Sequence, residues 1–302
     1  MKKKSIRSSL LLLLAATIWG VAFVAQSVGM DYMGPLSFNG ARFLMGGVVL
    51  LPLVIVRRKK DKDRQIPRAG MRVTLTGGIC CGLVLGMASL CQQNGIMYTT
   101  VGKAGFITTL YIIIVPVMGI FLRKKVSGRV WIGAALAALG MYLLCMNERL
   151  ALSRGDAYVF VCAILFAVHI LVIDYFSPRA DGVELSCIQF FTAGILSGVL
   201  AFMLEKPEIG SFINGIIPLA YAGIMSCGVA YTLQIIGQKD LDPTVASLIL
   251  SMESVVSMLA GWIILGQALS RKELLGCALV FGAVILVQLP DKKRMEQGVQ
   301  AG

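Results

Sequence analysis

The sequence predicts an all-α membrane protein in which ten transmembrane helices form two inverted five-helix repeats. Three observations carry this prediction. The chain of 302 residues is 57% hydrophobic and only 15% charged, its apolar residues fall into ten long runs, and its second half partly repeats its first. A soluble domain of this size needs a more polar surface, whereas a helix that crosses a bilayer needs about 20 apolar residues. Composition alone therefore favours a membrane protein.

The apolar runs predict the position of each span. We expect helices near 9–30, 35–56, 72–96, 101–122, 129–146, 156–177, 185–204, 214–237, 244–266 and 272–290. The first run follows a lysine-rich start, as in a secretory signal, but it continues through 19–25 without a small-residue cleavage site. We therefore expect it to be the first helix. The connections are short except for the charged segment 57–70 and the tail 291–302, which leaves no room between the spans for a soluble domain.

The basic residues predict the orientation of the chain. The formal net charge is +12, and 21 of the 28 lysines and arginines lie on one side of the predicted bilayer, which is the side of both termini. Cytoplasmic segments carry such an excess of Lys and Arg, so we expect both termini in the cytoplasm and a multi-pass protein of the cell membrane. The same distribution makes nucleic-acid binding improbable, because the positive charge follows the membrane topology.

Metal or cofactor chemistry is not indicated. All eight cysteines lie within predicted spans without metal-ligand spacing, and the single histidine, His169, cannot complete a zinc site. We interpret the cysteines as small apolar packing residues and expect no cofactor.

The internal repeat predicts where a site would lie. At an offset of 142 residues, Gln92 aligns with Gln234 and Tyr111 aligns with Glu253, and a weaker match pairs 19–21 with 166–168. Five helices is an odd number, so two repeats of the same fold must have opposite orientations. In such transporters the site lies near the bilayer midplane between the repeats. Tyr111 and Glu253 are therefore expected at similar depth near that interface.

The chain resembles the EamA-type transporters of the drug/metabolite transporter superfamily. The run QQNGIMYTTVGKAGFITTLY at 92–111, followed by Val115 and Pro116, is similar to the first EamA repeat, and 246–265 is similar to the second. The resemblance implies a first repeat at 9–146, a second, inverted repeat at 156–290 and a cytoplasmic tail at 291–302. It also implies a cavity lined by spans one, three, four, six, eight and nine. The chain departs from the family pattern at Lys124, Gln267 and Ser254.

Glu253 is the strongest candidate for a functional residue. A charged side chain at the bilayer centre costs about 2.5–3.5 kcal/mol on insertion scales, so it should face a cavity or a partner. We expect it to bind a substrate cation or a proton, and Ser257 lies on the same helical face. The alternative is a hydrogen-bonded glutamate that only holds two helices together.

The remaining candidates each have a functional and a structural interpretation. Tyr111 and Trp19 could line the cavity or pack in the core, and Lys103 could contact substrate or extend to the lipid headgroups. The amides of Gln92 and Gln234 could bind substrate or bridge helices. His169 could take part in proton coupling or make an interhelical hydrogen bond.

Three further features bear mainly on packing. Arg42, inside the second span, is expected to pair with backbone carbonyls or another side chain near the interface, and a direct functional role is the alternative. The glycines 78, 82 and 86 form a stripe that should let two helices of this chain approach closely. Pro116 should kink or loosen the fourth span.

The function that these features predict is secondary transport. We expect export of a small organic metabolite or drug-like compound by alternating access, with protons as the coupling ion to consider. An uptake permease or an uncoupled exchanger of the same fold is the alternative. A membrane-embedded enzyme or a receptor is more remote, because the sequence offers neither a nucleophile–base pair nor a phosphate loop. Substrate and oligomeric state are not specified by the sequence.

Overall fold

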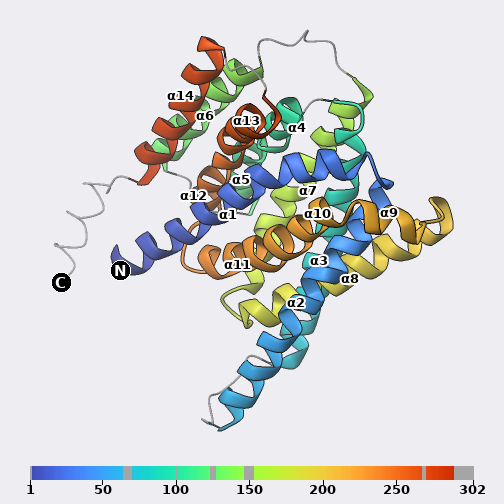
Figure 1. Ribbon diagram of the computed structural model, residues 1–302. Coiled ribbons are helices and arrows are strands. Elements are labelled where there is room, and N and C mark those ends of the chain that lie inside the picture. The colour runs from blue at the N-terminus through green and yellow to red at the C-terminus, as the bar shows by residue number, and fades with distance from the viewer. Residues whose placement is uncertain are drawn as a thin grey trace.

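The computed structural model describes residues 2–63, 70–99, 101–122, 127–145, 153–266 and 270–288. Every regular element in these residues is a helix (Figure 1). The elements of the first half are α1 (Lys2–Gly29), α2 (Pro35–Asp63), α3 (Met71–Ile96), α4 (Val101–Thr108), α5 (Tyr111–Phe121) and α6 (Gly128–Cys145). The second half has α7 (Arg154–Phe176), α8 (Gly182–Leu204), α9 (Ile209–Asn214), α10 (Ile216–Ala220), the π-helix η1 (Tyr221–Tyr231), α11 (Thr232–Gln238), α12 (Pro243–Leu250), α13 (Met252–Leu265) and α14 (Arg271–Gln288).

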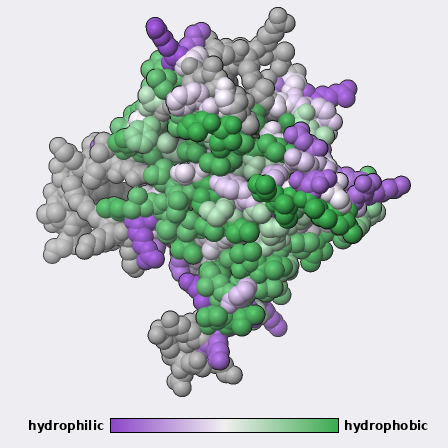
Figure 2. Space-filling model, viewed as in Figure 1, coloured by the Kyte–Doolittle hydropathy of each residue, from purple (hydrophilic) through white to green (hydrophobic). Residues whose placement is uncertain are grey.

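The helices have the length and composition of membrane spans. Eight helical segments within the described ranges are long and apolar enough to cross a bilayer, and two shorter apolar helices lie at Gly128–Gly140 and Leu274–Leu286. Large apolar side chains such as Phe121 and Ile217 point outward, at 83% and 81% exposure. Figure 2 shows hydrophobic side chains spread across the middle of one face, with hydrophilic ones projecting at its edges. The predicted all-α membrane fold is confirmed, whereas the ten-span count and the cytoplasmic termini stay predictions.

The helices pack in pairs that recur when the two halves are exchanged. α2 packs along α8, α3 along α7, and α6 along α14. The contact of α3 with α7 has its counterpart in the contacts of α1 with η1 and α11. The contacts of α4 and α5 with α7 correspond to those of α12 and α13 with α1. The broken spans α4–α5 and α12–α13 also touch each other, so elements of both halves surround the centre of the molecule.

The glycine stripe of α3 packs against α8 of the same chain, as the sequence predicts. A Cβ atom at Gly78 would lie 2.5 Å from the side chain of Ile188, and one at Gly82 would lie 2.5 Å from that of Thr192. The third member, Gly86, lies opposite Ala193 and Leu196. The absence of side chains here therefore lets the two helix backbones approach closely.

The helix pair α2–α8 is joined by polar contacts at both ends. At the start of α2, the Glu205 carboxylate accepts hydrogen bonds from the backbone N–H groups of Leu36 (2.8 Å) and Ser37 (2.7 Å) and from the Ser37 hydroxyl (2.7 Å). At the other end, Arg57 pairs with Asp181 at 3.2 Å and Arg58 with Glu184 at 2.9 Å. Glu205, at the end of α8, thus caps the start of α2, a helix that is distant from it in sequence.

Replacing Glu205 by alanine is expected to destabilise the protein by about 1–2 kcal/mol, because two N–H groups at the start of α2 lose their acceptor. The measurement is the thermal unfolding midpoint in detergent. Glu208→Ala is the matched control, since Glu208 has no side-chain hydrogen bond at the start of α9. Equal midpoints for the two variants would contradict the capping role.

Candidate functional site

Two membrane spans are broken at equivalent points. The fourth span is interrupted at Thr109 and Leu110, between α4 and α5, and the ninth at Ser251, between α12 and α13. Thr109 and Ser251 are separated by the repeat offset of 142 residues. Pro116 lies inside α5, so the interruption precedes the proline at which the sequence predicts a kink. Discontinuous helices of this kind bring their half-helix ends to the binding site of many transporters.

Side-chain hydroxyl groups accompany both interruptions. The Thr109 hydroxyl lies 3.0 Å from the carbonyl oxygen of Gly105 and 2.9 Å from that of Phe106. In the ninth span a series of hydroxyl groups donate to carbonyl oxygens three residues earlier, at 2.7–2.9 Å, from Ser247, Ser251, Ser254 and Ser257. Such bonds compete with the regular backbone pattern and bend helices. Ser254, at which this chain departs from the family pattern, belongs to that series.

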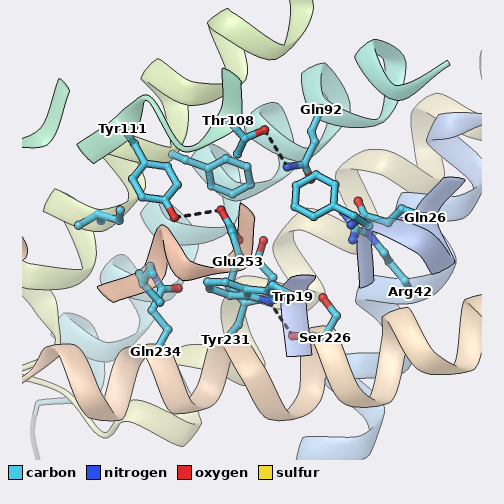
Figure 3. Close-up of a pocket in the computed structure, with 14 residues that line it drawn as sticks. Trp19, Gln26, Arg42, Gln92, Thr108, Tyr111, Ser226, Tyr231, Gln234 and Glu253 are labelled. Carbon is cyan, nitrogen blue, oxygen red and sulfur yellow. Dashed lines mark hydrogen bonds between the residues drawn. The ribbon is translucent and has the colours of Figure 1, made fainter. Parts of the chain in front are cut away.

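A pocket lies between the two halves, beside both interruptions (Figure 3). The space without protein atoms at this site, open solvent included, is about 460 Å³. Its lining comes from α1, α2, α3, α4, α5, α7, η1, α11, α12 and α13. The residues are Trp19, Phe23, Gln26, Arg42, Gln92, Thr108, Tyr111, Phe166, Ile170, Ser226, Tyr231, Gln234, Leu250 and Glu253. All six spans that were expected to line the cavity contribute residues, and the second span adds Arg42.

Tyr111 and Glu253 face each other across this pocket. The Tyr111 hydroxyl donates a hydrogen bond to Oε1 of Glu253 at 2.9 Å, and both side chains are buried. Tyr111 begins α5, and Glu253 lies in the first turn of α13. The positive end of a helix dipole favours a negative charge at this place. The hydrogen bond therefore joins side chains from the first turns of the two half-helices.

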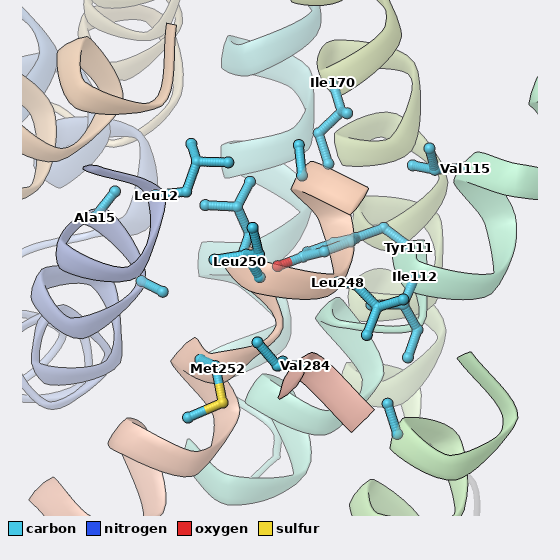
Figure 4. Close-up of a cluster of buried hydrophobic side chains, with 14 of the residues drawn as sticks. Leu12, Ala15, Tyr111, Ile112, Val115, Ile170, Leu248, Leu250, Met252 and Val284 are labelled. Carbon is cyan, nitrogen blue, oxygen red and sulfur yellow. The ribbon is translucent and has the colours of Figure 1, made fainter. Parts of the chain in front are cut away.

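An apolar shell surrounds the tyrosine ring. Figure 4 draws Tyr111 among buried side chains that include Ile112, Leu248 and Leu250, all of which belong to one hydrophobic cluster. This shell comes from both halves of the chain. It keeps the phenol ring in place and leaves its hydroxyl group directed to Glu253.

The two repeat-equivalent glutamines both line the pocket. Nε2 of Gln92 lies 3.4 Å from the Thr108 hydroxyl, and Nε2 of Gln234 lies 3.5 Å from Oε1 of Gln238. Gln238 in turn donates to the carbonyl oxygen of Ile170 at 2.5 Å. Oε1 of Gln234 is buried without a hydrogen-bond partner within the described part of the chain. An amide oxygen in this position can accept a hydrogen bond from a bound solute.

Trp19 forms one wall of the pocket against the π-helix. Its indole N–H donates to the carbonyl oxygen of Ser226 at 3.4 Å, and its ring centroid lies 4.5 Å from that of Tyr231. The wide turns of a π-helix leave carbonyl groups less regularly bonded, and such elements occur often at functional sites. Trp19 is thus a wall residue, which is one of its two predicted roles.

Other predicted site residues lie elsewhere. His169 is fully buried outside the lining, behind Phe166 and Tyr231, with ring centroids at 6.4 and 6.1 Å, and its Nε2 lies 3.2 Å from Oε1 of Gln189 on α8. Ser257 packs where α13 meets Gly105 of α4. The side chain of Lys103 lies outside the described residues, as do Lys124 and Gln267.

Residues of the lining form pairs at the repeat offsets. Five pairs can be made: Gln92 with Gln234, Thr108 with Leu250 and Tyr111 with Glu253 at 142, and Trp19 with Phe166 and Phe23 with Ile170 at 147. Ten of the 14 lining residues shown in Figure 3 belong to these pairs. Gln26, Arg42, Ser226 and Tyr231 lie outside them and make the pocket asymmetric.

Arg42, Gln26, Thr108, Ser226 and Tyr231 were not predicted as site residues. Arg42 was expected near the membrane interface, but it is buried and lines the pocket. Its position within an apolar run was a usable signal, because an ionisable residue inside a membrane commonly faces a cavity. Ser226 and Tyr231 gave no such signal, since their placement depends on the π-helix.

The arrangement is that of a pocket between elements of both halves of the chain. Comparison with known proteins agrees with it. The sequence profile of the EamA-like transporter family matches residues 6–146 and 153–289. The chain belongs to the EamA-like transporter family, within the drug/metabolite transporter superfamily.

Similar proteins from bacteria and archaea extend over nearly the whole chain. An uncharacterized transporter of Archaeoglobus fulgidus is 29% identical over 95% of this chain and 87% of its own length. The uncharacterized inner membrane transporter YedA of Escherichia coli is 22% identical, over 90% of this chain and 87% of its own length. A solved crystal structure with 18% identity has a TM-score of 0.75 and covers 93% of this chain and 96% of that chain. It shows the shared fold. The protein is thus a multi-pass membrane transporter.

Proposed function

We propose that this transporter exports a small organic metabolite or drug-like compound across the cell membrane by alternating access. The observation that supports this most is the pocket itself, which both halves of the chain enclose around the Tyr111–Glu253 pair. Its lining combines aromatic side chains with a few polar groups, as the lining of ligand pockets does. We further propose that 9–146 and 156–290 are inverted repeats and that both termini are cytoplasmic.

The packing supports a rocking motion of the two halves. Contacts between elements recur when the halves are exchanged, and five pairs of lining residues occupy repeat-equivalent positions. In a chain built this way, a conformation open to one side has a counterpart open to the other. The pair α6–α14, none of whose described side chains lines the pocket, would serve as scaffold.

Proton coupling through Glu253 is part of the proposal. The carboxyl group is buried, lines the pocket and, among the described residues, accepts one hydrogen bond, from Tyr111. A donor group of the solute and a proton would compete for the same carboxylate oxygens. Such competition makes the two ligands exchange, so that protons entering the cell drive the solute out. Uptake would instead require that the solute and the proton bind together. Uncoupled exchange would require that Glu253 keeps one protonation state throughout the cycle.

The test is transport by the purified protein in proteoliposomes. A thermal-shift screen against amino acids, nucleosides, sugars and organic cations first selects solutes that raise the unfolding midpoint. Each selected solute is then followed in vesicles with a pH gradient in either direction. We expect a flux above that of protein-free vesicles, which reverses with the gradient. No flux of any stabilising solute would overturn the proposed function, and flux that ignores the gradient would favour the uncoupled exchanger.

Replacing Tyr111 by phenylalanine tests the role of its hydroxyl. The variant keeps the ring in its apolar shell but leaves Glu253 without its donor, so a buried hydrogen bond worth about 1–3 kcal/mol is lost. We expect a stable protein whose gradient-driven flux falls about tenfold or more. Tyr221→Phe removes a hydroxyl that bonds the Ile18 carbonyl outside the pocket and should leave the flux near that of the native protein. Similar fluxes for both variants would count against the role of Tyr111.

A further inference from the structure

Arg42 is a buried cation to which the described part of the chain supplies no ion-pair partner. Its side chain is 1% exposed, and it lines the same pocket as Glu253. Among the residues that the structure describes, no carboxylate lies within ion-pair distance of it, since the ion pairs of α2 involve Arg57 and Arg58 instead. An unpaired charge taken out of water costs several kcal/mol, so a group that pairs with Arg42 would be strongly favoured.

The orientation of the guanidinium group is set by its own side of the pocket. Its Nε donates to Oδ1 of Asn39 at 2.8 Å, and Nδ2 of Asn39 donates to the carbonyl oxygen of Ser89 at 3.1 Å. The rings of Phe43 and Phe38 lie 4.8 and 5.8 Å from the guanidinium carbon. One edge and one face are therefore occupied within the protein.

The opposite edge of the guanidinium group is unsatisfied. Nη2 of Arg42 is buried without a hydrogen-bond partner in the described part of the chain. A guanidinium group presents two parallel N–H bonds in a geometry that matches a carboxylate. Because Nε is already bonded to Asn39, the edge that remains is the one formed by Nη1 and Nη2.

Aromatic and polar side chains together line the rest of the pocket. In Figure 3, Arg42 and Gln26 lie at one end and Tyr111 at the other. Trp19, Phe23 and Phe166 also line this space. A ligand that fills it would place an apolar or aromatic body against these rings and one polar group at each end.

We propose that Arg42 binds the carboxylate of the transported compound, and that the substrates are small organic carboxylates with an apolar body. This inference rests on the proposed transport function and adds the substrate class. The asymmetry of the pocket supports it, because Arg42 is outside the repeat-related pairs and introduces a charge on one side only. A purely structural Arg42, held by Asn39 and the phenylalanine rings, predicts no preference for anions.

The preference is measured with three probes of the same carbon skeleton. These are 3-phenylpropanoate, its neutral amide 3-phenylpropanamide and the cation 3-phenylpropylamine, each titrated against the native protein in detergent by calorimetry and thermal shift. We expect the carboxylate to bind at least tenfold more tightly than the amide and the amine. Equal or tighter binding of the amide or the amine to the native protein overturns the proposal without recourse to any variant.

Variants then assign the preference to one side chain. Arg42→Gln is expected to abolish the preference for the carboxylate, and Arg42→Lys, which keeps the charge but not the two-pronged geometry, should retain part of it. Arg57→Gln is the matched control, because Arg57 lies on the same helix and pairs with Asp181 at the surface. A preference that survives in Arg42→Gln overturns the assignment. If Arg42→Gln does not fold, the deciding variant is Arg42→Lys, in which a full preference for the carboxylate would overturn the assignment.

The same probes separate this inference from the proposed function. Vesicles that contain the native protein and move the amide or the amine, but not the carboxylate, would retain the transport function and overturn the substrate class. Movement of the carboxylate that is lost in Arg42→Gln and kept in Arg57→Gln supports both.

Discussion

Replacing Glu253 by glutamine is expected to abolish pH-gradient-driven transport, with a loss of at least about a hundredfold in initial rate. Glutamine has nearly the same shape and can still accept the hydrogen bond from Tyr111, which lies 2.9 Å from Oε1. It cannot carry a proton through the cycle. The measurement is the initial rate of solute flux in proteoliposomes with an imposed pH gradient, compared with solute exchange at equal pH, which the variant should retain in part.

Glu208→Gln is the control for this variant. Glu208 is an exposed carboxylate at the start of α9 and makes no cap hydrogen bond, so its substitution should leave both rates unchanged. Gradient-driven flux that persists in Glu253→Gln would contradict proton coupling through this residue. Loss of both rates would indicate that the carboxylate serves solute binding alone.

Replacing Gly20 by valine is expected to destabilise the protein by about 1–3 kcal/mol or more and to stop transport. A Cβ atom at Gly20 would lie 2.5 Å from Cβ of Val256 and 2.8 Å from the backbone carbonyl oxygen of Glu253. A helix backbone cannot move away as a flexible side chain can, so α1 and α13 must separate. That separation displaces Trp19 and Glu253 together, because both lie beside the contact.

Thermal unfolding and flux of the Gly20→Val protein provide the measurements. Gly282→Ala on α14 is the control, since a Cβ atom there meets nothing within 4 Å. The control should unfold at the native midpoint or slightly above it. A Gly20→Val protein with native midpoint and native flux would show that α1 and α13 do not depend on their close approach.

The sequence predicted the fold class and part of the site for a physical reason. Apolar runs of about 20 residues and the asymmetric basic residues follow directly from the bilayer. The repeat offset then aligned Tyr111 with Glu253, and the structure brings these side chains into a hydrogen bond. Residues at equivalent positions of an internal repeat occupy equivalent places in the fold. The repeat can therefore locate a candidate site before the packing is known.

What the sequence could not predict depends on backbone irregularity. The interruptions at Thr109 and Ser251 accompany hydrogen bonds from local hydroxyl groups to backbone carbonyl oxygens. Residues Tyr221–Tyr231 form the π-helix η1. No periodic pattern in the sequence indicates these interruptions or the π-helix. They decide that Ser226 and Tyr231 face the pocket and that His169 lies behind the wall, where it meets Gln189. The place of Arg42 in the pocket lining depends on how α2 packs along α8 and η1.

The most direct test of alternating access is the accessibility of the pocket from each side of the membrane. Ser226→Cys places a thiol in the pocket with little change in size, in a chain whose eight native cysteines are replaced by alanine. Ser197→Cys, buried on α8 outside the lining, is the control that should react from neither side. We expect a membrane-impermeant thiol reagent to modify Cys at 226 from both sides of oriented vesicles, and a bound solute to slow both reactions. Modification from one side only would contradict a pocket that opens alternately to the two sides.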